Sequence, residues 1–126
     1  MILGSVTSLL LNMLQGYDQQ KKKDPALLNL IERLLIWMES CVPDEAPEIL
    51  ILNKLQVVRR KRPLNIAETL ELGKLIGKEY SPEIRCGAYL LLGETDEAQK
   101  CFDKLDANSK DRFLKFPICI FGNLQC

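Results

Sequence analysis

The chain has 126 residues, of which 47% are hydrophobic and 27% charged, so its composition is that of one globular domain. Its 17 basic and 17 acidic residues give a formal net charge of zero, which supplies no long-range attraction to nucleic acid or an anionic membrane. The absence of histidine excludes histidine-dependent catalytic triads and removes the commonest metal ligand.

The five cysteines are widely spaced, and none of them forms a Cys-x-x-Cys pair. This spacing does not fit a zinc ribbon or a thioredoxin-like site. We therefore expect reduced core cysteines in a cytoplasmic protein, with a bridge between Cys86 and Cys101 as an open alternative. The five residues are Cys41, Cys86, Cys101, Cys119 and Cys126.

The N-terminal stretch is apolar but is interrupted by polar residues, and it lacks the basic flank of a signal peptide and the length of a membrane span. Apolar residues from Leu3 to Tyr17 recur at spacings of three and four, which predicts an amphipathic helix over residues 3–17. The lysines at 21–23 are expected to form a solvated loop rather than a phosphate site.

Asp24 and Pro25 predict the start of a second helix, because aspartate caps free amides and proline fits the first helical position. Apolar residues cover much of its circumference as far as Cys41, so we expect it to be packed on more than one side. For Trp37 we expect a core or interface position rather than a stacking platform.

Asp44 and Pro47 predict the start of a third helix, which ends in four consecutive cations before a proline. These cations complement the helix dipole, and they are also the candidate anion-binding or partner-binding residues Arg59, Arg60, Lys61 and Arg62. A capping box at Asn65 predicts a fourth helix that continues to a left-handed stop at Gly77.

A helical hairpin is predicted over residues 81–105, with Ser81 and Pro82 at its start, a turn at Gly93 and a second cap at Thr95. A last helix capped by residues 108–109 is expected to run to Phe116. The apolar run 118–121 is predicted to be an extended tail in a groove of its own domain or, alternatively, an exposed edge for a partner.

Two segments suggest a repeat, because Pro-Glu-Ile occurs at residues 47–49 and again at 82–84, with Leu55 and Leu90 in the same register. Ala67 and Ala98 occupy similar places in the helices that follow. In the second copy, the positions of four particular residues relative to one another resemble the pattern of a tetratricopeptide repeat. In that pattern an alanine marks the helix crossing and an aromatic residue fills the gap beside it. These residues are Tyr89, Gly93, Ala98 and Phe102.

The resemblance covers about 25 residues. It departs from the family at Cys86, where glycine is preferred, and at Pro82, where tryptophan is preferred, and no proline closes the unit. We therefore expect a single all-α domain over residues 1–126, with six to seven short helices in stacked antiparallel hairpins, as a tetratricopeptide-like array or an irregular bundle. Its expected units are 1–41, 44–77, 81–105 and 108–126.

Stacked helix pairs form a concave face, so the resemblance implies a non-catalytic module that binds a protein or peptide or serves in assembly, with a homodimer as a companion expectation. The alternative is binding of nucleic acid or another anion by residues 59–62, which the zero net charge does not favour. Glu68 and Glu71 share a helical face but lack an orienting third group, and no glycine-rich phosphate loop is present. We therefore expect no catalytic residues and no cofactor.

Overall fold

A computed structural model describes residues 2–41 and 47–125 of the chain. Within these residues the protein is all-helical, with seven α-helices, one 3₁₀ helix and no strand. The chain divides into two compact units, which we call unit 1 (residues 1–46) and unit 2 (residues 47–126). The predicted cap Asp44 lies outside the described residues.

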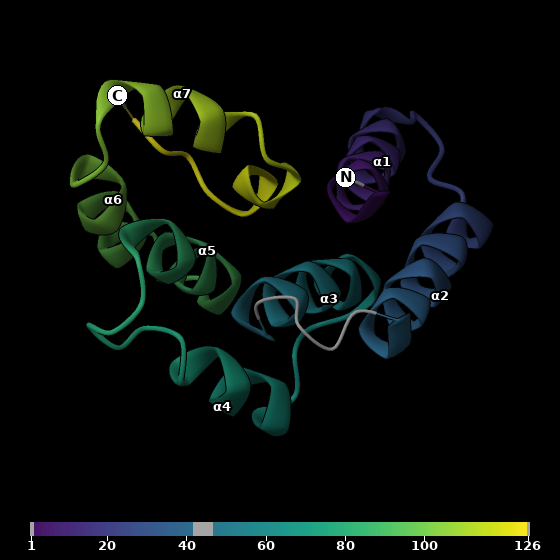
Figure 1. Ribbon diagram of the computed structural model, residues 1–126, viewed down its shortest axis with the longest axis horizontal. Helices are drawn as coiled ribbons and strands as arrows, with labels where there is room; N and C mark the ends of the chain where they lie inside the picture. The colour runs from purple at the N-terminus through teal and green to yellow at the C-terminus, as the bar shows by residue number, and fades with distance from the viewer. Residues whose placement is uncertain (1, 42–46, 126) are drawn as a thin grey trace. The chain divides into compact units, whose positions relative to one another are not determined.

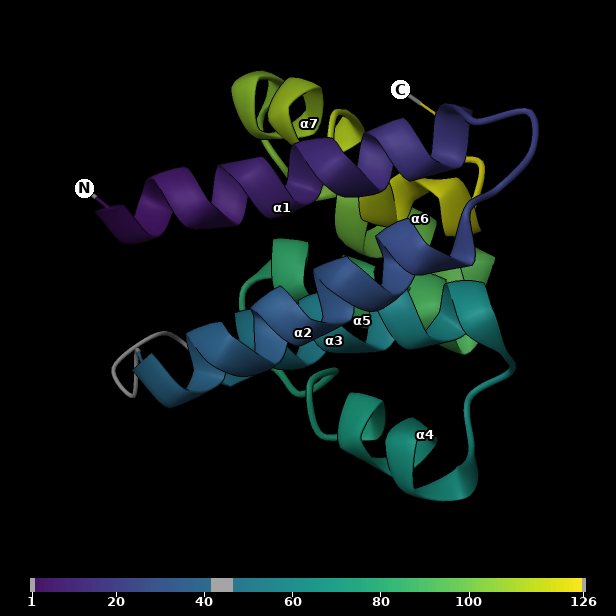
Figure 2. The same ribbon diagram turned by 90° about the vertical axis from the view of Figure 1, so that its right-hand side faces the viewer.

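Unit 1 consists of two antiparallel helices, α1 (Ile2–Gln19) and α2 (Pro25–Cys41), which pack against each other (Figure 2). The cap predicted at the start of α2 is present, because the Asp24 side chain accepts a 3.0 Å hydrogen bond from the Ala26 amide. Buried residues recur at spacings of three and four on both helices, as expected of amphipathic helices. They are Leu10, Leu14, Tyr17, Leu28, Ile31, Leu35 and Met38.

Unit 2 is arranged around one short helix, α5 (Pro82–Leu92), which contacts α3, α4, α6 and the 3₁₀ helix η1 (Figure 1). These neighbours are α3 (Pro47–Lys61), α4 (Ile66–Gly73), α6 (Thr95–Asp103) and η1 (Pro117–Phe121). The last α-helix, α7 (Ala107–Leu114), joins the same core through Phe113, whose ring lies 6.3 Å from that of Phe102.

The sequence explains why α5 is so short and well bounded. Its N-cap Ser81 accepts a hydrogen bond from the Ile84 amide, and Pro82 occupies the first turn. Its C-cap Gly93 has φ +79°, a left-handed conformation that costs glycine nothing. Between these ends five residues are buried, which fits a helix that contacts four other elements. They are Cys86, Gly87, Ala88, Leu90 and Leu91.

The end of α4 differs from the prediction. The left-handed stop at Gly77 is wrong: α4 already ends at Gly73, and its C-cap Lys74 is right-handed. The chain then tightens, because the Leu75 amide bonds the Leu72 carbonyl three residues back, and this turn buries Leu75. Gly77 therefore lies in a turn beyond the helix rather than at its end.

The caps of the last two helices also differ. Thr95 is the first residue of α6, after an N-cap Glu94 that makes no side-chain cap bond. In α7 the cap is Asp106 rather than residues 108–109, and its side chain accepts a 2.8 Å bond from the Ser109 amide. That bond lowers the pKa of the Asp106 carboxyl, since it favours the charged form.

The tail prediction is wrong in conformation. Residues 117–121 form the 3₁₀ helix η1 rather than an extended segment. Pro117 and Ile118 are buried, and Cys119 and Phe121 are partly buried against the core of unit 2, whereas Ile120 remains 55% exposed. The run thus packs on its own unit, as one of the two alternatives expected.

Candidate binding surfaces

The four consecutive cations at the end of α3 do not share one environment. The Arg60 guanidinium donates to the backbone carbonyl of Gln56 (2.9 Å) and to that of Pro117 (3.1 Å), and it lies 5.0 Å from the centre of the Phe121 ring. A guanidinium satisfies both contacts because it combines several N–H donors with a planar face that stacks on aromatic rings. Arg60 therefore attaches η1 to α3.

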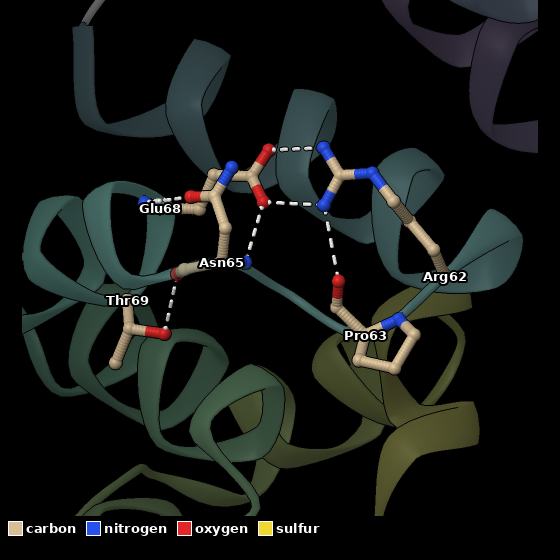
Figure 3. A network of polar contacts seen from close by, with 5 residues as sticks. All are labelled: Arg62, Pro63, Asn65, Glu68 and Thr69. Atoms are coloured by element: carbon tan, nitrogen blue, oxygen red, sulfur yellow. Dashed lines mark hydrogen bonds and ion pairs between the residues drawn. The ribbon is translucent and has the colours of Figure 1, made fainter.

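Arg62 is directed to the next helix. Its two terminal nitrogens each donate a 2.8 Å hydrogen bond to a different carboxylate oxygen of Glu68, and a third bond reaches the Pro63 carbonyl (Figure 3). The same carboxylate accepts a 2.9 Å bond from the Asn65 amide, which completes the capping box of α4. Both contacts favour the charged carboxylate, so Arg62 and then the Asn65 amide lower the pKa of Glu68.

Arg60 and Arg62 are therefore engaged in the fold of unit 2, and the side chains of Arg59, Lys61 and Arg62 are exposed. A site for phosphate would need several guanidinium or ammonium groups aimed at one point. Proximity in sequence does not aim these groups at one point, since Arg60 is turned toward η1 and Arg62 toward α4.

The lysine run is divided in a similar way. Lys23 donates to the carbonyls of Asp18 (2.6 Å) and Gln20 (3.1 Å), and its ammonium group lies 5.7 Å from the centre of the Tyr17 ring. A cation in this place complements the negative end of α1. Lys21 and Lys22 are exposed.

The residues quoted for the tetratricopeptide resemblance lie on α5 and α6, which contact each other. Ala98 and Phe102 have no exposed surface, Tyr89 is partly buried, and Gly93 forms the turn. In the proposed first copy Leu55 is buried like Leu90, but Ala67 is exposed, so no helix crosses at that alanine. No repeat of the hairpin is evident in α3 and α4, where the link spans residues 62–65 instead of 93–94.

Three cysteines are free thiols, so the alternative bridge between Cys86 and Cys101 is absent. Burial raises the pKa of Cys86 to about 12, with the thiols of Cys101 and Cys119 adding to the effect, and burial raises the pKa of Cys119 to about 11. Cys119 also donates its thiol hydrogen to the Phe113 carbonyl at 3.1 Å. Cys86 and Cys119 are therefore packed, protonated thiols with little nucleophilic character at neutral pH. The side chains of Cys41 and Cys126 lie outside the described residues.

Other chemistry is sparse in the described part of the chain. Of the two carboxylates on α4, Glu68 is held in the capping box and Glu71 is exposed. Among the described residues, no group of three or more cysteine, aspartate or glutamate side chains is placed to hold a metal ion. Within the same residues, each helix is too short or too polar to cross a membrane.

The sequence did not indicate the exposed apolar surface of α2. Leu30 is 37% exposed, Ile36 54% and Trp37 52%, although an almost wholly apolar helix was expected to be packed on more than one side. We call these three residues the α2 face. The sequence carries no signal for this face, because α2 is apolar around most of its circumference and only the fold shows which stripe is buried.

Comparison of the chain with protein-family models, curated proteins and solved structures finds no match.

Proposed function

We propose that this chain is a non-catalytic protein- or peptide-binding module and that it contacts its partner through the α2 face. The observation that carries the proposal is Trp37, which is about half exposed, next to the exposed Ile36 and two helical turns from the exposed Leu30. Tryptophan is costly to leave in water and is enriched among the residues that dominate binding energies.

The geometry of α2 supports one continuous surface. At 3.6 residues per turn, Leu30 and Trp37 lie two turns apart on the same stripe, with the exposed Arg33 between them. Ile36, the residue before Trp37, lies to one side of this stripe. The buried Ile31 and Leu35 occupy the opposite side of the helix. The core contacts of α2 are therefore made without the α2 face.

The chemistry of the α2 face defines the partner. Apolar side chains at this spacing fit an amphipathic helix or a short apolar peptide, and Arg33 suits a carboxylate at its edge. A second copy of the chain is one form that such a partner takes, which keeps the homodimer within the same proposal.

Trp37 also supplies the test, because it is the single tryptophan of the chain, and its fluorescence reports on this surface alone when the titrated partner lacks tryptophan. Proteins captured from a lysate would be purified and titrated into the chain. Burial of the indole is expected to shift its emission to shorter wavelength, and a dilution series of the chain alone tests self-association in the same way.

Matched variants make the test specific. Leu30→Ser with Ile36→Ser is expected to weaken binding by at least about tenfold, since each removes apolar contact from the interface. Ile66→Ser with Leu70→Ser is the control, because these α4 residues are 81% and 64% exposed and equally apolar. Equal binding by both double variants, or no emission shift with any captured protein, would refute the role of the α2 face.

The anion-binding alternative has a sharper test than the sequence allowed. Arg59→Glu removes an exposed cation, whereas a change at Arg60 would also disturb η1. A mobility shift with single-stranded nucleic acid that weakens with salt and disappears in Arg59→Glu would support it. The absence of a shift at low salt would exclude it.

A further inference from the structure

The C-terminal segment 122–125 is held to α6 by a pattern that resembles strand pairing. The Gln99 side chain donates from Nε2 to the Gln125 carbonyl (2.7 Å) and accepts at Oε1 from the Gln125 amide (2.8 Å). Its amide group thus pairs with both backbone groups of one residue, as a neighbouring strand would. Because only backbone atoms are contacted, this pairing accepts any residue other than proline.

Two further contacts define a surface beneath the segment. Gly122 is extended, and a Cβ at that position would lie 2.5 Å from Cδ2 of the buried Leu90, so any other residue would require the Leu90 side chain to shift. Two residues later, Leu124 is partly buried against the core of unit 2. The surface therefore favours glycine at position 122, accepts any residue at position 123 and favours an apolar residue at position 124. At position 125 it pairs with the backbone.

The segment does not fill the space available to it. A cavity of about 640 Å³ is lined on one side by the α6 residues Thr95, Asp96 and Gln99, and on the other by residues 120–123 and 125. Figure 1 shows the yellow C-terminal segment turning back from η1 toward α6 and α7. Upstream the chain is fixed more firmly, because Arg60 bonds the Pro117 carbonyl and Ile118 is buried.

We propose that the surface formed by Leu90, Thr95 and Gln99 is a binding site for an extended polypeptide segment of the pattern Gly-x-apolar, which the chain's own residues 122–125 occupy until a partner segment displaces them. The site lies in unit 2 and is independent of the α2 face. Recognition combines a backbone pair, which gives affinity, with one glycine-sized and one apolar position, which give specificity.

The attached segment competes at a high effective concentration, on the order of millimolar for a short tether, so a free peptide binds the unaltered chain weakly. Gly122→Val is designed to remove this competition, because its side chain would overlap Leu90 while α5 and α6 keep their own residues. The probe is the capped peptide Gly-Asn-Leu-Gln, which reproduces residues 122–125. Binding is followed by shifts of the backbone amide NMR signals of Leu90, Thr95 and Gln99.

We expect the peptide to bind Gly122→Val with saturable shifts and at least about tenfold more tightly than the unaltered chain. Adding Gln99→Ala to that variant should abolish the shifts. Gln125→Ala alone is the matched control: it should leave the pairing and the weak peptide binding unchanged, because Gln125 is contacted through its backbone.

The proposal is overturned if a folded Gly122→Val chain shows no saturable peptide binding, or if Gln99→Ala leaves that binding intact. Should Gly122→Val fail to fold, Leu124→Ser releases the same segment by removing its apolar anchor, and the same peptide titration then decides. A peptide with valine in place of the glycine should not bind to either variant.

Discussion

Arg62 and Glu68 join the end of α3 to the start of α4 through two parallel hydrogen bonds of 2.8 Å. The Glu68 carboxylate also caps α4 through the Asn65 amide, so one side chain serves both an ion pair and a helix terminus (Figure 3). The four-residue link between the two helices is thereby fixed at both ends.

This arrangement predicts an acid-sensitive contribution to stability. The pKa of Glu68 is lowered in the folded protein, so its contribution is present above its unfolded pKa near 4.5 and is lost as pH falls through the lower folded pKa. Glu68→Gln is expected to cost about 1 kcal/mol at pH 7 and much less at pH 3. Urea unfolding followed by circular dichroism at both pH values measures the difference. Glu71→Gln on the exposed side of α4 is the control, and an equal, pH-independent loss in both variants would contradict the expectation.

The burial of Ala98 predicts that a larger side chain does not fit between α5 and α6. The residue has no exposed surface and lies on α6 beside the central helix of unit 2. Ala98→Trp is expected to unfold unit 2 or to lower its unfolding free energy by about 3 kcal/mol or more, because a packed core has no room for an indole. Ala98→Gly should cost only about 1 kcal/mol. Helical circular dichroism during urea unfolding distinguishes them, and an unchanged midpoint for Ala98→Trp would show that the helices do not approach at this residue.

Replacement of glycine by alanine is expected to change stability in opposite directions at Gly93 and Gly73. Gly93→Ala places a Cβ at φ +79° and is expected to cost about 1–2 kcal/mol. Gly73→Ala meets nothing within 4 Å on α4 and is expected to gain a few tenths of a kcal/mol by reducing the freedom of the unfolded chain. Thermal unfolding of the two variants side by side measures the contrast, which a shared sign would contradict.

Cys86 predicts that alkaline pH destabilises unit 2. Its pKa is raised from 9.0 to about 12 by burial, so the thiol is protonated and stabilising below pH 9, and stability is lost as pH rises from 9 toward 12. In Cys86→Ala this part of the pH dependence should be reduced. In the folded chain iodoacetamide at pH 8 should modify Cys86 and Cys119 slowly, and unfolding in urea should speed both reactions. Rapid modification of Cys86 under native conditions, measured by peptide mass spectrometry, would contradict its burial.

The sequence was sufficient for features that depend on local chemistry. The capping box at Asn65, the proline start of α5 and the glycine that ends it are each determined by a few adjacent residues, and all three are confirmed. The cap of α7 was predicted at residues 108–109, and the structure has it at Asp106 instead.

Features that depend on distant residues could not be predicted. Gly77 and Gly93 each follow an apolar segment that was predicted to be helical. Only Gly93 ends its helix, whereas α4 ends earlier, in a tight turn that buries Leu75. Arg60 belongs to a run of four cations, and only the fold brings it to a carbonyl 57 residues away. The α2 face was missed for the same reason, since an apolar residue on a helix does not indicate whether a neighbour covers it.

The central place of α5 has a consequence for the order of folding. It meets α6 across a link of residues 93–94, whereas its contacts with α3 and η1 must close much longer loops. Short loops close first, so the α5–α6 hairpin is expected to form before α3 and η1 join it, and the Arg60–Pro117 bond to form last. Arg60→Met should therefore speed unfolding while leaving the refolding rate unchanged, a difference between the two arms of a stopped-flow denaturant series. The same substitution would slow refolding if η1 docked early.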